Sequence, residues 1–192
     1  MASLRGSLEP DRLDPPQYDR GHAGVALTIR PSPDSGEPEL LLVRRATFSG
    51  DPWSGHMALP GGRWQSSDPS LRATAIRETF EETGVDLSGS GAEGLLGRLP
   101  IVEPRNRHLP PTVVHPFVFV TSPDTRASVT SHEVAEVCWA PVPLLADPTR
   151  HGTYEVLVRD GASAQRGAER PLQVPGMVFN ERIVWGLTYR IL

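Results

Sequence analysis

A pair of glycines followed by a short polar loop and an acidic helix constrains this chain more than any other feature. The stretch covers residues 60–85 and reads PGGRWQSSDPSLRATAIRETFEETGV. We expect Asp68 to be the N-cap of the helix and Pro69 to take its first position, where a missing N–H costs nothing. Gly84 suits the left-handed position that ends a helix. Both ends of the helix are therefore indicated locally.

The predicted helix has two different faces. Apolar residues with helical spacing predict a packed stripe of Ala73, Ile76 and Phe80. Carboxylates at i, i+3 and i+4 lie on the opposite side and belong to Glu78, Glu81 and Glu82. Like charges at this spacing destabilise a helix by about 0.2–0.5 kcal/mol per pair, and an ion pair between Arg77 and Glu81 compensates only part of that. A hard divalent cation, Mg²⁺ or alternatively Mn²⁺, would neutralise the rest; a solvated face of ion pairs is the other interpretation.

The same residues resemble the Nudix box, GxxxxxE, seven residues, then REUxEExGU with U aliphatic. Residues 77–85, RETFEETGV, match every charged position of the second half, while Thr79 stands at an aliphatic position. Counted from Gly62, Asp68 takes the place of the first glutamate and Arg77 comes one residue late. We interpret Asp68 as a helix cap only. The resemblance implies an α/β (α+β) Nudix fold, with a mixed β-sheet sandwiched between α-helices.

The segment before the box resembles the coenzyme A pyrophosphatases of the same superfamily, whose pattern is LLTxRSxxxRxxxGxxxFPGG. The residues in matching order are Leu41, Leu42, Arg45, Gly55, Pro60, Gly61 and Gly62. Val43, Ala46 and Leu59 depart from the pattern, and its internal Arg is missing. The resemblance implies Mg²⁺-dependent hydrolysis of coenzyme A or acyl-CoA to 3′,5′-ADP and (acyl-)4′-phosphopantetheine. Alternatives are ADP-ribose, nucleotide sugars or (d)NTPs as substrates, or a catalytically degenerate nucleotide-binding module.

The resemblance also implies roles for individual residues. The metal ligands are Glu78, Glu81 and Glu82. Catalysis involves Glu78, Glu81, Arg77 as an orienting partner and Glu133 from a later loop; either Glu78 or Glu133 is the general base, and Glu136 is the second loop candidate. The expected substrate-binding residues are Arg44, Arg45, Gly61, Gly62, Arg63, His56 and Trp53.

Some of these residues have structural alternatives. Trp53 and Phe48 offer flat faces for an adenine base, or they cover the edge of the core. His56 contacts a phosphate or holds its loop. Arg105, Arg107 and His108 reach the phosphates or belong to a solvated loop.

The remaining chain reads mainly as strands, with His22 at a strand end. We expect strands over 22–29, 39–45, 94–102, 113–121 and 134–142, with Pro116 marking a bulge or an edge. A short helix over 143–147 precedes a hairpin formed by 154–160 and 170–179. We expect residues 180–192 to form a closing helix capped by Asn180, with Ile183, Leu187 and Ile191 toward the core.

Composition limits the classes of function. The 192 residues, 38% of them hydrophobic, predict an N-terminal arm over 1–20 and one domain over 21–192. A net charge of −4 argues against a nucleic-acid partner, and all 19 basic residues are Arg, which suits bidentate phosphate contacts. The lone Cys138 and the absence of a long apolar run favour a cytoplasmic protein without a membrane segment. The partners expected are a small-molecule nucleotide and, by family resemblance, a second copy in a homodimer.

Overall fold

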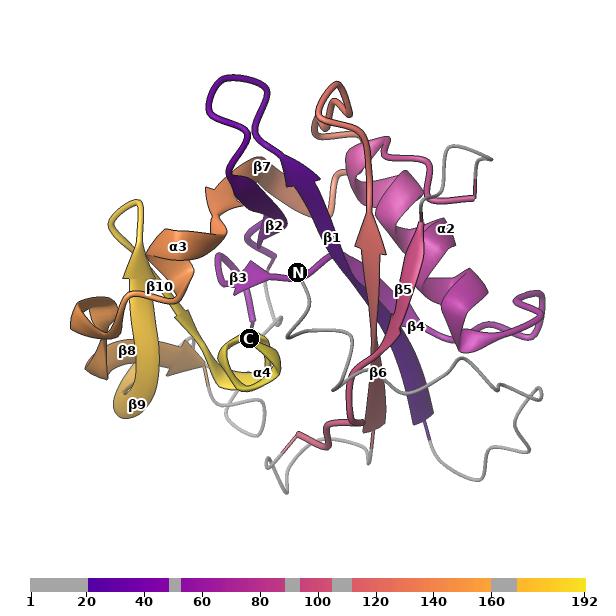
Figure 1. Ribbon diagram of the computed structural model, residues 1–192. Helices are drawn as coiled ribbons and strands as arrows, with labels where there is room; N and C mark the ends of the chain where they lie inside the picture. Colours follow the sequence, from indigo (N-terminus) through magenta and orange to yellow (C-terminus); the bar gives the residue numbers. More distant parts are fainter. Residues whose placement is uncertain (1–20, 49–52, 89–93, 105–111, 160–168) are drawn as a thin grey trace.

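A seven-stranded mixed sheet forms the centre of the protein. The computed structural model describes residues 21–48, 53–88, 94–104, 112–159 and 169–192. Along the sheet the strand order is β3 (Met57–Ala58), β2 (Pro38–Arg45), β1 (Gly21–Pro31), β6 (Thr112–Val120) and β5 (Leu95–Arg98). In addition, β4 (Gly61–Arg63) pairs with β1 and β7 (Val134–Pro141) pairs with β2. The sheet is mixed because β1 and β6 run parallel while the other pairs are antiparallel (Figure 1).

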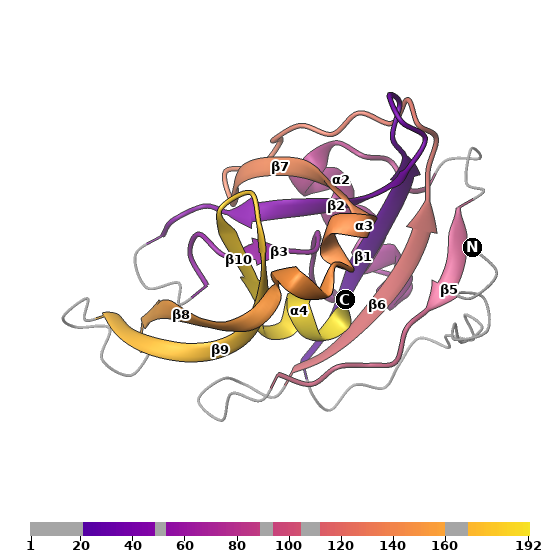
Figure 2. The ribbon, with the colours of Figure 1, turned by 60° about the vertical axis from the view of Figure 1, so that its left-hand side comes forward.

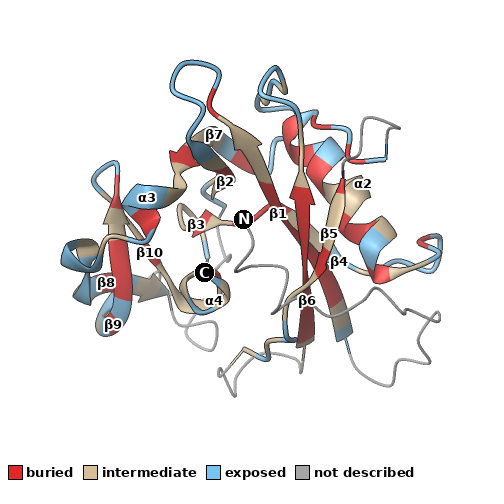
Figure 3. Cartoon of the chain, viewed as in Figure 1, coloured by how far each residue is buried: buried red, intermediate tan, exposed pale blue. Residues whose placement is uncertain are grey.

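Both faces of this sheet are covered. On one face helix α2 (Leu71–Thr83) packs Leu71 and Ala75 against Ala26, Leu41 and Phe117. The other face packs against α4 (Gly186–Ile191) and the end of a second sheet (Figure 2). Burial on both faces explains the continuous apolar runs in β1 and β6, which Figure 3 shows as the buried centre of the molecule. The expected mixed sheet between helices is confirmed.

The second sheet is a three-stranded antiparallel meander. It consists of β8 (His151–Arg159), β9 (Glu169–Phe179) and β10 (Arg182–Trp185), and it follows α3 (Val142–Leu145) and the 3₁₀ turn η1 (Pro148–Arg150). The hairpin predicted over 154–160 and 170–179 is confirmed where the chain is described. The short helix predicted over 143–147 is confirmed as α3, which begins one residue earlier and ends two residues earlier than predicted.

The closing helix predicted over 180–192 is wrong in its first half. Asn180 and Glu181 have φ of 48° and 61° and form a tight turn instead of a helix cap. Both central residues of a type I′ hairpin turn need positive φ, so this turn reverses the chain into β10. The β-branched residues Ile183 and Val184 then pair with β9, and only residues 186–191 are helical. Tertiary pairing overrides the helical spacing here.

Helix α2 also differs from its prediction. Its N-cap is Ser70, whose Oγ accepts from the Ala73 N–H at 3.1 Å, so Asp68 is not the cap. Gly84 ends the helix as predicted, with φ 71°. Within the predicted apolar stripe, Ile76 packs against the core but Phe80 is 55% exposed, so the stripe is wrong at its C-terminal end. The buried face instead holds Leu71, Thr74, Ala75, Thr79, Glu82 and Thr83.

Threonines can fill this buried face because their hydroxyls bond back to the helix. Thr79 Oγ1 donates to the Ala75 carbonyl at 2.7 Å, and Thr83 Oγ1 donates to the Thr79 carbonyl at 2.6 Å. A buried hydroxyl that is hydrogen-bonded carries little penalty, which leaves its methyl free to pack. A prediction that counts Thr as polar therefore assigns the wrong face of the helix to the core.

The other strands agree with the sequence. Each of the five strand predictions matches an observed strand, and His22 lies at the start of β1, where its Nδ1 hydrogen-bonds His115 Nε2 at 3.1 Å. Pro116 does not mark an edge, because β6 lies between β1 and β5. None of the described helices is long and apolar enough to cross a membrane. The predicted arm over 1–20 lies outside the described residues.

Candidate active site

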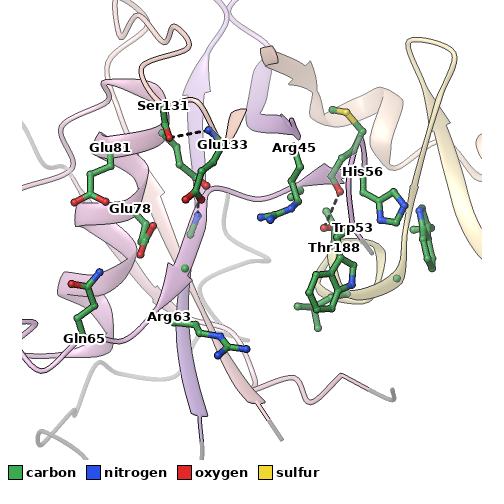
Figure 4. Close-up of a pocket in the computed structure, with 18 residues that line it drawn as sticks. Arg45, Trp53, His56, Arg63, Gln65, Glu78, Glu81, Ser131, Glu133 and Thr188 are labelled. Carbon is green, nitrogen blue, oxygen red and sulfur yellow. Dashed lines mark hydrogen bonds between the residues drawn. The ribbon is translucent and has the colours of Figure 1, made fainter. Parts of the chain in front are cut away.

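A cavity of about 620 Å³ brings together most of the residues predicted to act. Its wall includes Glu78, Glu81 and Glu82 from α2, Glu133 from the loop before β7, and Arg45, His56, Trp53, Gly61, Gly62 and Arg63. In Figure 4 the carboxylates line one side, Trp53 and His56 the other, and Arg45 lies between them. Acidic, cationic and aromatic groups therefore face one space.

The glycine turn brings β4 very close to β1 and α2. A Cβ on Gly61 would lie 2.6 Å from the Cα of Val25, and its φ of 150° is one that side chains rarely adopt. A Cβ on Gly62 would lie 2.3 Å from the carboxyl carbon of Glu78. Gly61 requires glycine because backbone atoms crowd it, whereas a side chain at position 62 would have to displace the Glu78 carboxylate. The expectation of a tight approach beside the helix is confirmed.

Glu82 is the most enclosed carboxylate of the site, with 6% of its surface exposed. Its Oε2 accepts the Gly61 N–H at 3.1 Å. Burial raises the pKa of Glu82 to about 7, and the negative charges of Glu78 and Glu133 add to that shift. The charge of Arg45 opposes this shift without cancelling it.

Glu78 and Glu81 differ in their surroundings. The Glu78 side chain is 16% exposed, and burial raises its pKa while Arg77 opposes that shift. The Glu81 side chain is 54% exposed and accepts from Arg77 Nη1 at 3.1 Å. This i,i+4 pair was predicted and is confirmed. Arg77 Nη1 also lies 2.9 Å from Glu78 Oε1, so a single guanidinium serves two of the glutamates.

Asp68 anchors that guanidinium. Arg77 Nε donates to Asp68 Oδ1 at 2.9 Å and Nη2 donates to Oδ2 at 3.0 Å, a bidentate pair. Thr74 and the Gln65 backbone donate to the same carboxylate, whose pKa is lowered mainly by Arg77. The interpretation of Asp68 as a helix cap only is therefore wrong. The one-residue insertion leaves Asp68 within reach of Arg77 because the loop folds back onto the first turns of α2.

Glu133 reaches the site because its loop satisfies the C-terminal end of α2. Ser128 N donates to the Thr83 carbonyl at 3.0 Å and Thr130 Oγ1 donates to the Glu81 carbonyl at 2.8 Å. These are carbonyls for which a helix end has no internal partner. The Glu133 carbonyl then accepts from Ala46 N at 2.8 Å, which fixes Glu133 beside β2.

The carboxylates of the cavity have the donor chemistry of a divalent-cation site, although they do not enclose an ion. Within the described residues, no three His, Cys, Asp or Glu side chains are close enough to enclose an ion as they stand. The donor chemistry nevertheless fits: the four carboxylates that line the cavity supply only hard oxygen atoms, and burial with mutual repulsion raises the pKa of Glu82 and Glu78. A cation among them would relieve that repulsion.

Several predicted residues do not meet the others. Arg44 is not among the residues that line the cavity, and its Nε donates to Glu136 Oε2 at 3.0 Å. Arg182 Nη2 donates to the same oxygen at 2.7 Å, so Glu136 bridges two arginines. Phe48 packs edge-on against His132 with ring centroids 5.9 Å apart. Arg105, Arg107 and His108 lie outside the described residues.

The C-terminal segment supplies wall residues that the sequence did not indicate. Trp185, Gly186, Leu187 and Thr188 line the cavity, as do Gln65 and Ser131. Trp185 packs edge-on against His56 with ring centroids 4.7 Å apart, and Thr188 Oγ1 donates to the Met57 carbonyl at 3.2 Å. The C-terminal residues matched no catalytic motif in the sequence analysis. Leu187 and Ile191 pack against the core as predicted, and Leu187 also lines the cavity.

Three comparisons place the chain among known proteins. Residues 22–160 match the family model of the NUDIX domain. An uncharacterized protein of Schizosaccharomyces pombe is 35% identical over 112 residues, 57% of this chain and 34% of that protein. The peroxisomal coenzyme A diphosphatase ndx-8 of Caenorhabditis elegans is 29% identical over 147 residues, 75% of this chain and 59% of that protein. The chain thus spans less than two thirds of either relative.

The solved structures agree in fold. The NUDIX domain of Shewanella oneidensis NrtR, complexed with ADP ribose, is similar with a TM-score of 0.52 and 21% identity, over 74% of this chain and 83% of that domain.

Proposed function

The chain belongs to the Nudix family, and from that premise we propose that it is a metal-dependent pyrophosphohydrolase of nucleoside diphosphate derivatives. The substrate we propose is coenzyme A or acyl-CoA, cut to 3′,5′-ADP and (acyl-)4′-phosphopantetheine. The observation that carries the proposal is the meeting of Glu78, Glu81, Glu82 and Glu133 with Arg45 and Arg63 around one cavity. The similarity to the C. elegans coenzyme A diphosphatase supports coenzyme A as the substrate.

The residues divide the chemistry among them. Glu78, Glu81 and Glu82 would hold the cation, Mg²⁺ or Mn²⁺, which supplies charge neutralisation of the diphosphate and a more acidic water. Arg45 and Arg63 would contact the phosphate oxygens with guanidinium groups, which suit them geometrically. Either Glu78 or Glu133 would accept the proton of the attacking water. The pair of Asp68 and Arg77 would keep Glu78 and Glu81 in orientation.

An experiment on the purified chain tests this proposal. Coenzyme A, ADP-ribose, a nucleotide sugar and a dNTP are each incubated with and without Mg²⁺, and the phosphate products are identified. We expect 3′,5′-ADP from coenzyme A in the presence of Mg²⁺, and loss of that product in Glu82→Gln. Faster cleavage of ADP-ribose, with no 3′,5′-ADP from coenzyme A, would favour the other nucleotide substrates. No cleavage of any substrate would favour a nucleotide-binding module.

The same assay addresses the base. If Glu133 accepts the proton, Glu133→Gln lowers kcat strongly while leaving the affinity for Mg²⁺ unchanged. If Glu78 does, Glu78→Gln lowers both, because that residue is also proposed as a ligand. A cytoplasmic location and a homodimer remain predictions, which fractionation and the mass in solution would test.

A further inference from the structure

A second cavity opens from the same site. It encloses about 250 Å³, beside the larger cavity of about 620 Å³. The turn Gly61–Gly62 and the charged side chains Arg45, Arg63 and Glu82 line both. The other residues that line both are Trp53, Ala58, Leu187 and Thr188. The two spaces therefore meet where the cationic side chains and the most buried carboxylate lie, which is where the proposed function puts the diphosphate.

The smaller cavity, which we call the aliphatic arm, lies between β1, β6 and α4. Of the described residues that line only this arm, Thr112 alone has a polar side chain. The apolar ones include Ala23, Val25, Val43, Leu59, Val114 and Ile191. Val25, Leu59 and Val114 also belong to the core cluster, so packing holds the wall in place. An occupant with hydroxyl groups would lose its water here and find few partners.

The other branch has a different character. His56 and Trp185 line only the larger cavity, and Trp53 lies where the two cavities meet; Figure 4 shows Trp53 and His56 across Arg45 from the glutamates. The His56 and Trp185 rings are in edge-to-face contact. Trp53 remains 40% exposed, so part of its ring surface is available to a ligand. Flat rings of this kind suit a nucleobase, whose π face stacks on aromatic side chains. We call this branch the aromatic arm.

We propose that this site is forked, with the diphosphate at the fork, the nucleobase in the aromatic arm and a branched aliphatic group in the aliphatic arm. The inference rests on the proposed function and adds the source of its selectivity. The pantoyl unit of coenzyme A carries a dimethyl carbon next to its phosphate, whereas ADP-ribose and nucleotide sugars carry a polyhydroxylated ring. The aliphatic arm favours the first, about threefold to fourfold per buried methylene, and penalises the second.

This assignment makes the C-terminal segment selective. Ile191 lines the aliphatic arm only, and Trp185 lines the larger cavity only. The two residues are six positions apart and act on opposite halves of the substrate. Neither lies in the acidic helix, so substitution at either should alter the choice of substrate and spare the hydrolytic groups.

Binding of phosphorylated fragments of the candidate substrates tests the fork without hydrolysis. The full-length chain is titrated calorimetrically with 4′-phosphopantetheine, ribose 5-phosphate and AMP. We expect the wild type to bind 4′-phosphopantetheine at least tenfold more tightly than ribose 5-phosphate. Ile191→Asn should weaken 4′-phosphopantetheine about tenfold and AMP less than twofold. Trp185→Leu should show the reverse. The matched control is Ile101→Asn, because Ile101 is 50% exposed and does not line either arm.

Two results would overturn the proposal: equal affinity of the wild type for 4′-phosphopantetheine and ribose 5-phosphate, or equal weakening of AMP and 4′-phosphopantetheine by Ile191→Asn. If Ile191→Asn does not fold, Val114→Thr, which keeps the shape and adds one hydroxyl inside the arm, should produce the same selective loss. A different result would overturn the proposed function, namely the absence of Mg²⁺-dependent cleavage of any diphosphate by the wild type.

Discussion

Helix α2 and the C-terminal segment β10–α4 form opposite walls of one cavity and are built in different ways. Helix α2 has 13 residues, a side-chain N-cap at Ser70 and a glycine C-cap at Gly84. Helix α4 has six residues, and its N-cap Trp185 makes no side-chain capping hydrogen bond in the described structure. The first wall presents three carboxylates to the cavity, whereas the second presents Trp185, Gly186, Leu187 and Thr188 and no charged group.

The difference in construction between the two walls indicates different roles. Groups that handle charge need fixed positions, and α2 provides them through its caps and through the bidentate pair of Asp68 with Arg77. Groups that recognise an apolar shape need only a surface, which a short helix packed on the core can supply. The acidic wall should thus determine whether hydrolysis occurs, and the C-terminal wall should determine which substrate is hydrolysed.

The largest expected effect would come from the acidic wall. Glu82→Gln removes the charge from the most buried of the proposed ligands, and we expect kcat to fall by roughly 10²–10³-fold. Product formation under saturating Mg²⁺ measures it. Glu37→Gln, in an exposed turn, is the control. Activity above half of wild type in Glu82→Gln would break the assignment of this wall to catalysis.

A smaller loss should follow when the support of that wall is weakened. Asp68→Asn retains the shape but removes the charge that holds Arg77, and we expect kcat to fall about 10–100-fold. A positioning role also predicts a rise in the Mg²⁺ concentration needed for half-maximal rate, which a purely structural role would not produce. Asp124→Asn, which changes an exposed loop, should leave both quantities unchanged. An unaltered Mg²⁺ dependence would contradict the role.

The substitution Glu82→Gln, which should lower activity, should raise the stability of the metal-free protein. The pKa of Glu82 rises from 4.5 to about 7 on folding, so its contribution to stability is complete below pH 4.5 and is lost as the pH rises through about 7. Chelator-treated Glu82→Gln should therefore be more stable than wild type by about 1–3 kcal/mol at about pH 8, and equally stable at about pH 4.

Thermal unfolding at several pH values measures this difference. Glu81→Gln is the matched control, because the Glu81 side chain is 54% exposed and removal of its charge should leave the pH dependence unchanged. A constant gap between wild type and Glu82→Gln across the pH range would show that burial of this carboxylate is not its cause.

The smallest effect would come from the C-terminal wall. Gly186 has φ of 65° with open space around its missing Cβ, so Gly186→Ala costs only backbone strain, about 1 kcal/mol. The melting temperature should fall by roughly 2–4 °C while kcat is retained. Gly152→Ala, where a Cβ meets only ordinary contacts, should have no such effect. A large loss of kcat in Gly186→Ala would show that this wall contributes to catalysis, which would contradict the different roles assigned to it and to α2.

Much of the site could be predicted from sequence because its signals are local. The three glutamates of α2, Arg77 and the glycine turn lie within 25 residues of one another. Helical spacing alone places Glu78, Glu81 and Glu82 near one another. The strands of the main sheet were also predictable, since runs of β-branched and aromatic residues signal burial on both faces.

The errors occurred where distant contacts decide the outcome. Phe80 was predicted to be buried and Thr79 was not considered for the core, because apolar spacing cannot register a hydroxyl that bonds back to its own helix. Asp68 was interpreted as a cap, whereas the folded loop brings it to Arg77. Arg44 was expected at the substrate and pairs with Glu136, which lies 92 residues further along the chain.

The sequence by itself determined the acidic helix, its partner turn and the strands that carry them, because each depends on interactions between near neighbours. Only the tertiary structure decided which face of α2 is buried, which arginine faces the cavity and that residues 185–188 form its far wall. Those choices depend on pairing of β10 with β9 and on packing across the sheet. Contacts between residues far apart in the chain leave no periodic trace in it, so the aliphatic arm became visible only in the folded protein.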